Sequence, residues 1–261
     1  MLHVRRLMAQ FVVGLALLTA ALPAQAEIGV EEKLGNTLPL EAQFVNEEGK
    51  TVTLKDLIDR PTILALVYFR CPGICGPLMG GLADIVEKME MTPGDEYQII
   101  TISFDPTEGP ELAKRKKATY HKVIRRPVGD ASWRFLTGKQ DAIDAITEAV
   151  GFQYEQTGKD FQHPAVIAAI SPEGKLTRYL YGVEFLPFDV KLALIEAADG
   201  RVGPTISKVL LYCFSYDPEG QTYVFNILKV TGTVTLLFLA LFLVFLVITT
   251  RRYRKNKQAE A

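Results

Sequence analysis

The sequence predicts an α/β domain with a mixed sheet, followed by one C-terminal transmembrane helix. Segments typical of buried strands alternate with segments typical of amphipathic helices between residues 43 and 198. Two cysteines, Cys71 and Cys75, stand where a buried strand passes into a helix, and a β-hairpin and a closing helix follow much later. This order of elements is that of a thioredoxin-like fold. A long apolar run near the carboxyl end predicts the membrane helix.

The first elements are a hairpin, a strand and a helix. Residues 43–53 place alternating apolar positions around Asn46-Glu47-Glu48-Gly49, which suits a turn. Residues 62–69, TILALVYF, form a continuous apolar run, as expected of a central strand covered on both faces. Pro77 then opens a helix that should reach Met89, because proline is tolerated in a first helical turn.

The later elements continue the alternation. We expect a strand at 97–104, helices at 111–124, 139–150 and 189–198, and a hairpin formed by 165–170 and 176–181. In the helix at 139–150, Ile143, Ile146 and Val150 share one face, and Gly151 can cap the end. The sequence shows no internal repeat and no linker here, so residues 27–200 are predicted to form one domain.

The amino-terminal segment has the form of a cleaved signal peptide over residues 1–26. Arg5 and Arg6 precede the apolar run 11–22, and Ala24-Gln25-Ala26 offers small residues at the cleavage site. An uncleaved anchor is the alternative, but this run is shorter than the ~20 residues that span a bilayer.

The carboxyl-terminal segment is typical of a single transmembrane helix. Residues 230–250 are uncharged and rich in Leu, Phe and Val, and the basic segment 251–261 follows, which predicts a cytoplasmic tail. A buried core helix is the alternative, and the cations directly after the apolar run argue against it. Residues 201–229 would be a juxtamembrane extension. The two ends therefore predict a single-pass protein of a bacterial cytoplasmic membrane whose domain lies in the periplasm.

Composition narrows the function classes. With 48% hydrophobic residues and a net charge of −1 over 261 residues, the chain can form a good-sized core and is not a nucleic-acid binder by charge. The three cysteines are too few for a disulfide framework, and their number is odd. In an oxidising compartment, thiols must be protected, paired or bound to metal.

Cys71 and Cys75 are four positions apart, so one helical turn would point both sulfur atoms the same way. A purely stabilising disulfide is disfavoured, because closing so small a loop removes little entropy from the unfolded chain. A reversible redox pair or a thiolate metal site remains. A helix N-terminus would suit both, since its dipole lowers thiol pKa values.

A two-cysteine metal site needs a third ligand, and the chain has three histidines. His3 falls in the signal peptide. His121 lies in a basic helical stretch, where we expect a solvated surface residue. His163 precedes the predicted strand 165–170, which a thioredoxin-like fold places beside the end of the first buried strand; a plain loop residue is the alternative. Two thiolates and an imidazole suit Cu(I) and accept Cu(II), whereas Zn(II) usually takes a fourth ligand.

Four segments resemble, in order and spacing, the landmarks of the Sco/SenC copper proteins. They are YFRCPGIC, TISFDP, GDASWRFLTG and DFQHPAVIAAISPEGKLTRYLYG. The resemblance covers roughly residues 38–198. It implies a thioredoxin-like fold in which Cys71, Cys75 and His163 are the copper ligands, and in which Asp105 of SFDP is the family's acidic residue near the site.

The resemblance also implies a function. Family members take part in assembling the CuA centre of cytochrome c oxidase, as copper donors, as reductants of its cysteines, or both. We therefore expect a membrane-tethered metallochaperone whose partner is the CuA-bearing subunit, with other copper chaperones or thiol reductants as further partners. A metal-free thiol-disulfide oxidoreductase that uses Cys71 and Cys75 is the alternative.

Some positions depart from the usual family pattern, and the third cysteine lies outside the core of the resemblance. Gly73 and Gly76 occupy places where the family commonly has an acidic residue and a proline. Cys213 lies in LLYCFSYDPEGQTY, which resembles the extension of a C-terminally anchored branch of the family. Its roles could be burial, pairing with another chain or soft ligation, and the apolar neighbours favour burial.

Overall fold

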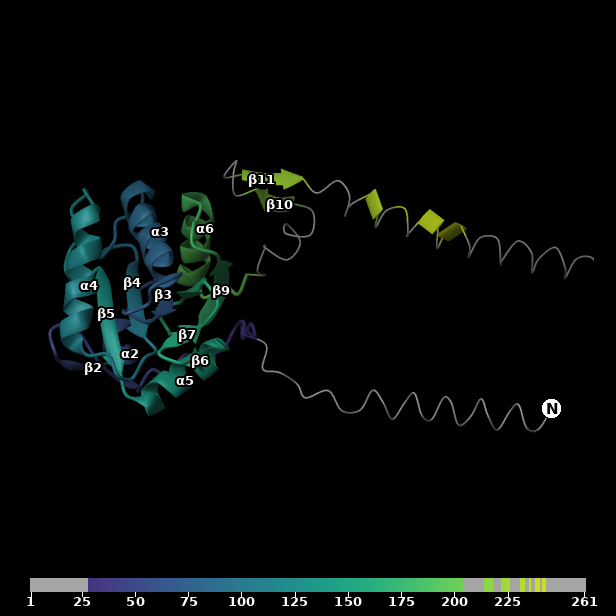
Figure 1. The fold of residues 1–261 in the computed structure, drawn as a ribbon. Coiled ribbons are helices and arrows are strands. Elements are labelled where there is room, and N and C mark those ends of the chain that lie inside the picture. Colours follow the sequence, from purple (N-terminus) through teal and green to yellow (C-terminus); the bar gives the residue numbers. More distant parts are fainter. Residues whose placement is uncertain are drawn as a thin grey trace, which may run out of the picture. The chain divides into compact units, whose positions relative to one another are not determined.

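A computed structural model describes residues 28–203, the strand segments 214–217 and 222–225, and a few helical positions between 231 and 242 (Figure 1). The chain divides into two compact units, 1–202 and 203–261, which are described separately. In the second unit, β10 (Phe214–Asp217) and β11 (Thr222–Phe225) form an antiparallel pair.

The first unit is built on a seven-stranded mixed sheet in the order β2-β1-β5-β4-β3-β8-β9. Its strands are β1 (Gln43–Val45), β2 (Thr51–Thr53), β3 (Thr62–Val67), β4 (Gln98–Ser103), β5 (Trp133–Gly138), β8 (Val166–Ile170) and β9 (Leu176–Tyr181). Strands β3, β4 and β5 are parallel, and the other pairings are antiparallel. This is the mixed sheet of a thioredoxin-like fold.

Five helices of the first unit are described with the sheet. They are α2 (Leu54–Leu57), α3 (Cys75–Lys88), α4 (Pro110–Val123), α5 (Gln140–Val150) and α6 (Pro187–Ala198). Helix α3 packs between α4 and α6 along one face of the sheet (Figure 1). Helix α5 buries the predicted face of Ile143, Ile146 and Val150 and ends at Gly151, whose φ of 65° is the left-handed conformation that glycine adopts readily.

The predicted strands and hairpins are confirmed where hydrophobic pattern and turn chemistry agree. All six residues of β3 are buried, as a central strand requires. The hairpins β1–β2 and β8–β9 both form. Strand β8 runs antiparallel to β3 with Ala65 opposite Ile167, so the chain just before β8 returns to the carboxyl end of β3. The sheet thereby brings the segment of His163 to the cysteines.

Helix α3 begins earlier than predicted. Its first residue is Cys75, and Pro77 is the third residue of the helix. None of the amide groups in the first turn has a partner within the helix, so a proline at the third position sacrifices no helical hydrogen bond. Cys75 therefore belongs to the helix, while Cys71 lies in the preceding loop.

The structure adds elements that the sequence analysis does not predict. Strand β5 contains the half-buried Arg134 between the fully buried Trp133 and Phe135, and this charge interrupts the apolar run expected of an inner strand. A short antiparallel pair, β6 (Glu155–Thr157) and β7 (Asp160–Gln162), precedes His163 and lacks an apolar pattern.

Several predicted segments lie outside the described residues. They are the signal peptide at 1–26, Cys213, the basic tail at 251–261 and most of the transmembrane helix at 230–250. Within the part of the chain that the structure describes, no helix combines the length and apolar character needed to cross a bilayer.

Candidate metal centre

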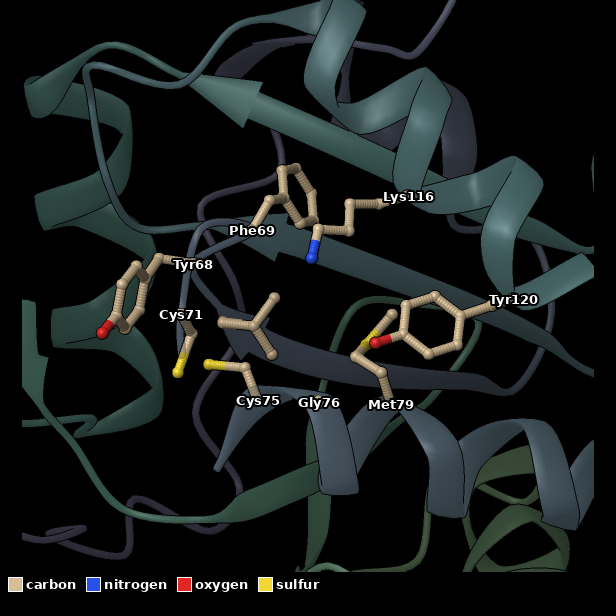
Figure 2. A pocket seen from close by; sticks show the side chains of 9 residues that line it. Tyr68, Phe69, Cys71, Cys75, Gly76, Met79, Lys116 and Tyr120 are labelled. Carbon is tan, nitrogen blue, oxygen red and sulfur yellow. The ribbon is translucent and has the colours of Figure 1, made fainter. Parts of the chain in front are cut away.

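The candidate metal centre lies at the carboxyl end of β3. Cys71 follows that strand in a loop, Cys75 starts α3, and His163 stands between β7 and β8. One ligand atom from each residue, the two Sγ atoms and an imidazole nitrogen, lies within 4.8 Å of the others. Both thiols are free, and their sulfur atoms face each other (Figure 2). The sheet thus brings together the three residues singled out in the sequence.

His163 presents its Nε2 atom to the thiols. Its Nδ1 lies 3.0 Å from the carbonyl oxygen of Pro164, and Nε2 lies 3.2 Å from Cys75 Sγ. A carbonyl oxygen only accepts, so Nδ1 donates its proton there and Nε2 keeps its lone pair. Burial lowers the pKa of His163, which favours the neutral ligand form. The described residues contain no cis peptide bond, so the His163-Pro164 bond is trans.

An aromatic wall holds the imidazole ring in place. The ring centroids of Phe104, Tyr68 and Phe152 lie 5.2, 5.9 and 6.0 Å from that of His163. The Tyr68 hydroxyl accepts a hydrogen bond from the backbone amide of Phe161 at 3.4 Å, and burial raises the pKa of Tyr68 to about 12. These neutral rings restrict the rotation of the imidazole and limit the access of water from that side.

The two thiols differ in their environments. Cys75 is buried, and this burial raises the pKa of its thiol. Cys71 is half-buried; burial opposes its ionisation, but hydrogen bonds from the Cys75 amide and thiol and from the Gly73 amide outweigh it and lower the pKa of Cys71. The Gly73 nitrogen lies 3.4 Å from Cys71 Sγ. In the metal-free protein Cys71 is thus the more readily ionised thiol, and a bound metal would displace the proton from both.

A small cavity adjoins the thiols on the side of α4. Its volume is about 10 Å³, room for about one water molecule. It is lined by Val67, Tyr68, Phe69, Cys71, Cys75, Gly76, Met79, Lys116 and Tyr120 (Figure 2). The immediate surroundings of the two sulfur atoms are therefore tightly packed on this side.

Asp105 and His121 lie outside the group of three ligand residues. The Asp105 carboxylate accepts hydrogen bonds from the amide and hydroxyl of Thr107, at 2.9 and 2.7 Å, and so orders the loop before α4. His121 is half-buried against Trp133, with ring centroids 6.5 Å apart, and its Nε2 has no hydrogen-bond partner among the described residues. The prediction of a solvated His121 is wrong because Trp133 belongs to the unpredicted strand β5.

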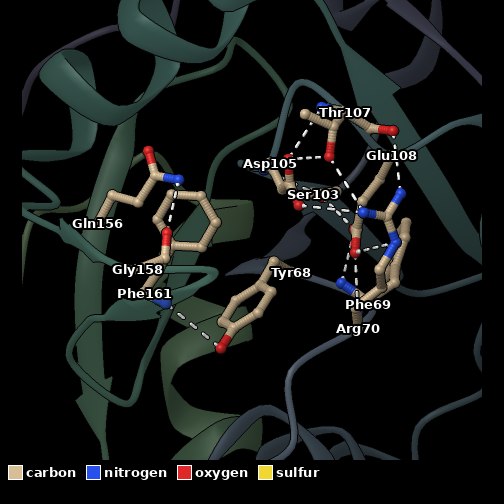
Figure 3. A network of polar contacts seen from close by, with 10 residues as sticks. All are labelled: Tyr68, Phe69, Arg70, Ser103, Asp105, Thr107, Glu108, Gln156, Gly158 and Phe161. Atoms are coloured by element: carbon tan, nitrogen blue, oxygen red, sulfur yellow. Dashed lines mark hydrogen bonds and ion pairs between the residues drawn. The ribbon is translucent and has the colours of Figure 1, made fainter.

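Glu108 is a residue of this region that the sequence analysis misses. Its side chain is fully buried, and its carboxylate accepts hydrogen bonds from the amides of Phe69 and Arg70 and from the Ser103 hydroxyl (Figure 3). In the sequence, Glu108 stands in the polar stretch TEGPELAK, where an acidic residue is typical of an exposed helix start. No local pattern indicates its burial.

Comparison with known proteins identifies the family. The SCO1/SenC family model matches residues 33–187, which is more than half of the chain. The chain belongs to the SCO1/SenC family. A SCO1 protein homolog of Bacillus subtilis (strain 168) is 28% identical over 160 residues, which cover 59% of this chain and 79% of that relative.

Solved structures of SCO1/SenC proteins and related chains share the fold. A putative electron transfer protein from Aquifex aeolicus VF5 matches with a TM-score of 0.59 and 28% identity, covering 65% of this chain and 96% of that one. Arabidopsis thaliana ScoI with copper bound has a TM-score of 0.51 at 21% identity, over 64% of this chain and 99% of that one. BsSco, described as a member of the Sco family of cytochrome c oxidase assembly proteins and as having a disulfide switch, has a TM-score of 0.50 at 24% identity, over 65% and 97%.

Proposed function

We propose that this SCO1/SenC protein binds copper through Cys71, Cys75 and His163 and serves the assembly of the CuA site of cytochrome c oxidase. The observation that carries the proposal is the convergence of two free thiols and an unprotonated imidazole nitrogen within 4.8 Å. Two soft sulfur ligands suit Cu(I), and the imidazole allows Cu(II). A solved relative of the same fold contains copper, which supports this choice of metal.

Copper is the cargo in this proposal. Both thiolates and the His163 Nε2 would hold it, and transfer would proceed by ligand exchange with cysteines and histidines of the CuA-bearing subunit. Exchange of the two thiols with a protein disulfide would form one S–S bond between Cys71 and Cys75, would reduce the other disulfide to two thiols, and would remove both thiolate ligands. Copper release would thereby depend on the redox state of the pair.

We further propose that the protein is tethered to a bacterial cytoplasmic membrane. Residues 230–250 would span it, residues 1–26 would be removed on export, and the domain would lie in the periplasm. The tether would confine copper delivery to the membrane that contains the oxidase subunit.

The central experiment is a copper titration of the reduced full-length chain in detergent. We expect one copper ion per chain for the wild type, and for His163→Ala a weaker Cu(II) complex with an altered thiolate-to-copper absorption band, because a ligand is lost. His121→Ala is the matched control, since it removes a half-buried histidine outside the centre.

A metal-free thiol-disulfide oxidoreductase is the second candidate. The unequal thiols favour it, because a half-buried, readily ionised Cys71 can attack a disulfide while the buried Cys75 resolves the mixed disulfide. High reductase turnover together with unchanged copper affinity and spectrum in His163→Ala would decide for this second function.

A further inference from the structure

We propose that Glu108 is a positioning residue of the candidate metal centre, because its buried carboxylate fixes the segment that delivers Cys71. The inference rests on the proposed copper-binding function and deepens it. The hydrogen bonds of the Glu108 carboxylate go to Phe69, Arg70 and Ser103 and not to the ligand atoms. It acts on the backbone directly before the first cysteine.

The contacts of Glu108 are short and involve both of its oxygen atoms. Oε2 accepts hydrogen bonds from the Phe69 amide and from the Ser103 hydroxyl, each at 2.6 Å, and Oε1 accepts one from the Arg70 amide at 2.7 Å (Figure 3). Phe69 and Arg70 are the two residues before Cys71. The loop between β3 and α3, residues 68–74, is called the thiol loop. Ser103 is the last residue of β4, so Glu108 connects the thiol loop to a buried strand of the sheet.

The position requires a carboxylate. Strand β3 ends at Val67, and the amides of Phe69 and Arg70 lie beyond its ladder, so these donors need an acceptor outside the sheet. A carboxylate has only acceptor sites, whereas the amide of a glutamine would present N–H groups to one of the donors. The Arg70 Nε atom, 3.9 Å from Oε1, offsets part of the buried negative charge.

Asp105 offers a matched comparison within the same loop. It is also a buried acid, but its hydrogen bonds go to Thr107 in its own loop and not to the backbone before Cys71. Glu108→Gln and Asp105→Asn therefore make the same chemical change three residues apart. Only the first removes acceptors from the backbone of the thiol loop, because Asp105 meets that loop through the Arg70 guanidinium, whose Nη1 lies 3.9 Å from Oδ2.

The test compares both variants with the wild type in the full-length chain. The measurements are Cu(I) affinity by chelator competition, the absorption and EPR spectra of the Cu(II) form, and amide hydrogen exchange of the metal-free, reduced protein. For Glu108→Gln we expect an affinity lower by about 10- to 100-fold, the loss typical of groups that support metal ligands. We also expect changed Cu(II) spectra and about tenfold faster exchange at Phe69 and Arg70, as for loss of a buried hydrogen bond. Asp105→Asn should keep wild-type affinity, spectra and exchange at these amides.

Wild-type affinity, spectra and exchange in Glu108→Gln would overturn the inference. Equal losses in Glu108→Gln and Asp105→Asn would also overturn it, since they would indicate general destabilisation of the loop. Should Glu108→Gln fail to fold, Ser103→Ala removes one of the three hydrogen bonds to the same carboxylate, together with the acceptor of the Asp105 amide, and should give a smaller change in the same direction. No change at Phe69 and Arg70 would contradict the proposal. A wild-type chain that binds no copper would refute the proposed function. The hydrogen-exchange rates of Phe69 and Arg70 in the metal-free protein would still test whether Glu108 orders the thiol loop.

Discussion

The thiols of Cys71 and Cys75 differ in exposure and in acidity: Cys71 is half-buried and the more acidic, and Cys75 is buried. Because the pKa of Cys71 is lowered from its ordinary value of 9.0 and that of Cys75 is raised, we expect iodoacetamide to modify Cys71 first in the metal-free, reduced protein. The rate should rise with pH through the lowered pKa of Cys71 and level off before the thiol of Cys75 ionises.

Peptide mass spectrometry after timed alkylation measures this order. The variant Gly73→Pro tests the cause of the lowered pKa. It removes the amide that donates to Cys71 Sγ, so the pH profile of the alkylation rate should shift to higher pH. Equal rates for the two thiols would contradict the asymmetry described above.

Single residues also show where sequence reasoning succeeds. Cys71, Cys75 and His163 could be grouped in advance, because each stands next to a strongly apolar strand whose place in the sheet follows from the order of elements. Glu108 could not be found in this way. Its burial depends on the pairing of β3 with β4, which brings the Phe69 amide and the Ser103 hydroxyl to the same carboxylate and exists only in the folded sheet.

Helix α3 positions Cys75 and depends on close packing at one glycine. A Cβ atom at Gly81 would collide with the carbonyl oxygen of Val183, whereas a Cβ at Gly80 would meet nothing within 4 Å. We therefore expect Gly81→Ala to destabilise the domain by about 1–3 kcal/mol, the usual effect of overpacking. Gly80→Ala should stabilise it by about 0.5–1 kcal/mol, since alanine favours a helix.

Urea unfolding of the two alanine variants, followed by circular dichroism, tests this difference between neighbouring glycines. A similar free energy of unfolding for both would show that α3 is free to move away from the loop that contains Val183.

Strand β5 could not be predicted from the sequence for a physical reason. Strand β5 contains Arg134, and this charge is accommodated because Glu47 in the β1–β2 turn lies 3.2 Å away. The pairing joins residues far apart in the sequence, so local pattern cannot predict it. By contrast, β3 and β4 are buried along their whole length, and their apolar sequences alone predict them.

Across the whole molecule, Glu47 links the β1–β2 turn to α4 and to β5. Burial opposes its ionisation, but hydrogen bonds from Lys117 and from backbone amides, including that of Phe135, outweigh it and lower the pKa of Glu47. Because the folded pKa is below the unfolded one, its stabilisation is present above about pH 4.5 and is lost as the pH falls through the folded value.

The variant Glu47→Gln should lower the free energy of unfolding by about 3–5 kcal/mol at pH 7, since it leaves the buried Lys117 ammonium without its carboxylate partner and with the neutral carbonyl oxygen of Asp130 as an acceptor. Thermal unfolding at pH 7 and at pH 3 measures the effect, and the gap between variant and wild type should narrow at the lower pH. Lys50→Gln, which breaks an exposed pair with Glu48, is the control and should leave the free energy of unfolding nearly unchanged. A gap that stays constant with pH would argue against a charged Glu47.

The antiparallel pairing of β3 with β8 sets an order of events in the biogenesis of the protein. His163 is 88 residues from Cys75 along the chain, and only this pairing brings them together. Before β8 pairs with β3, Cys71 and Cys75 are close together along the chain, but His163 is not yet beside them. Under the proposed function, copper binding by all three residues therefore follows folding. An ion bound by all three would in turn connect the ends of β3 and β8 and slow the unfolding of the sheet.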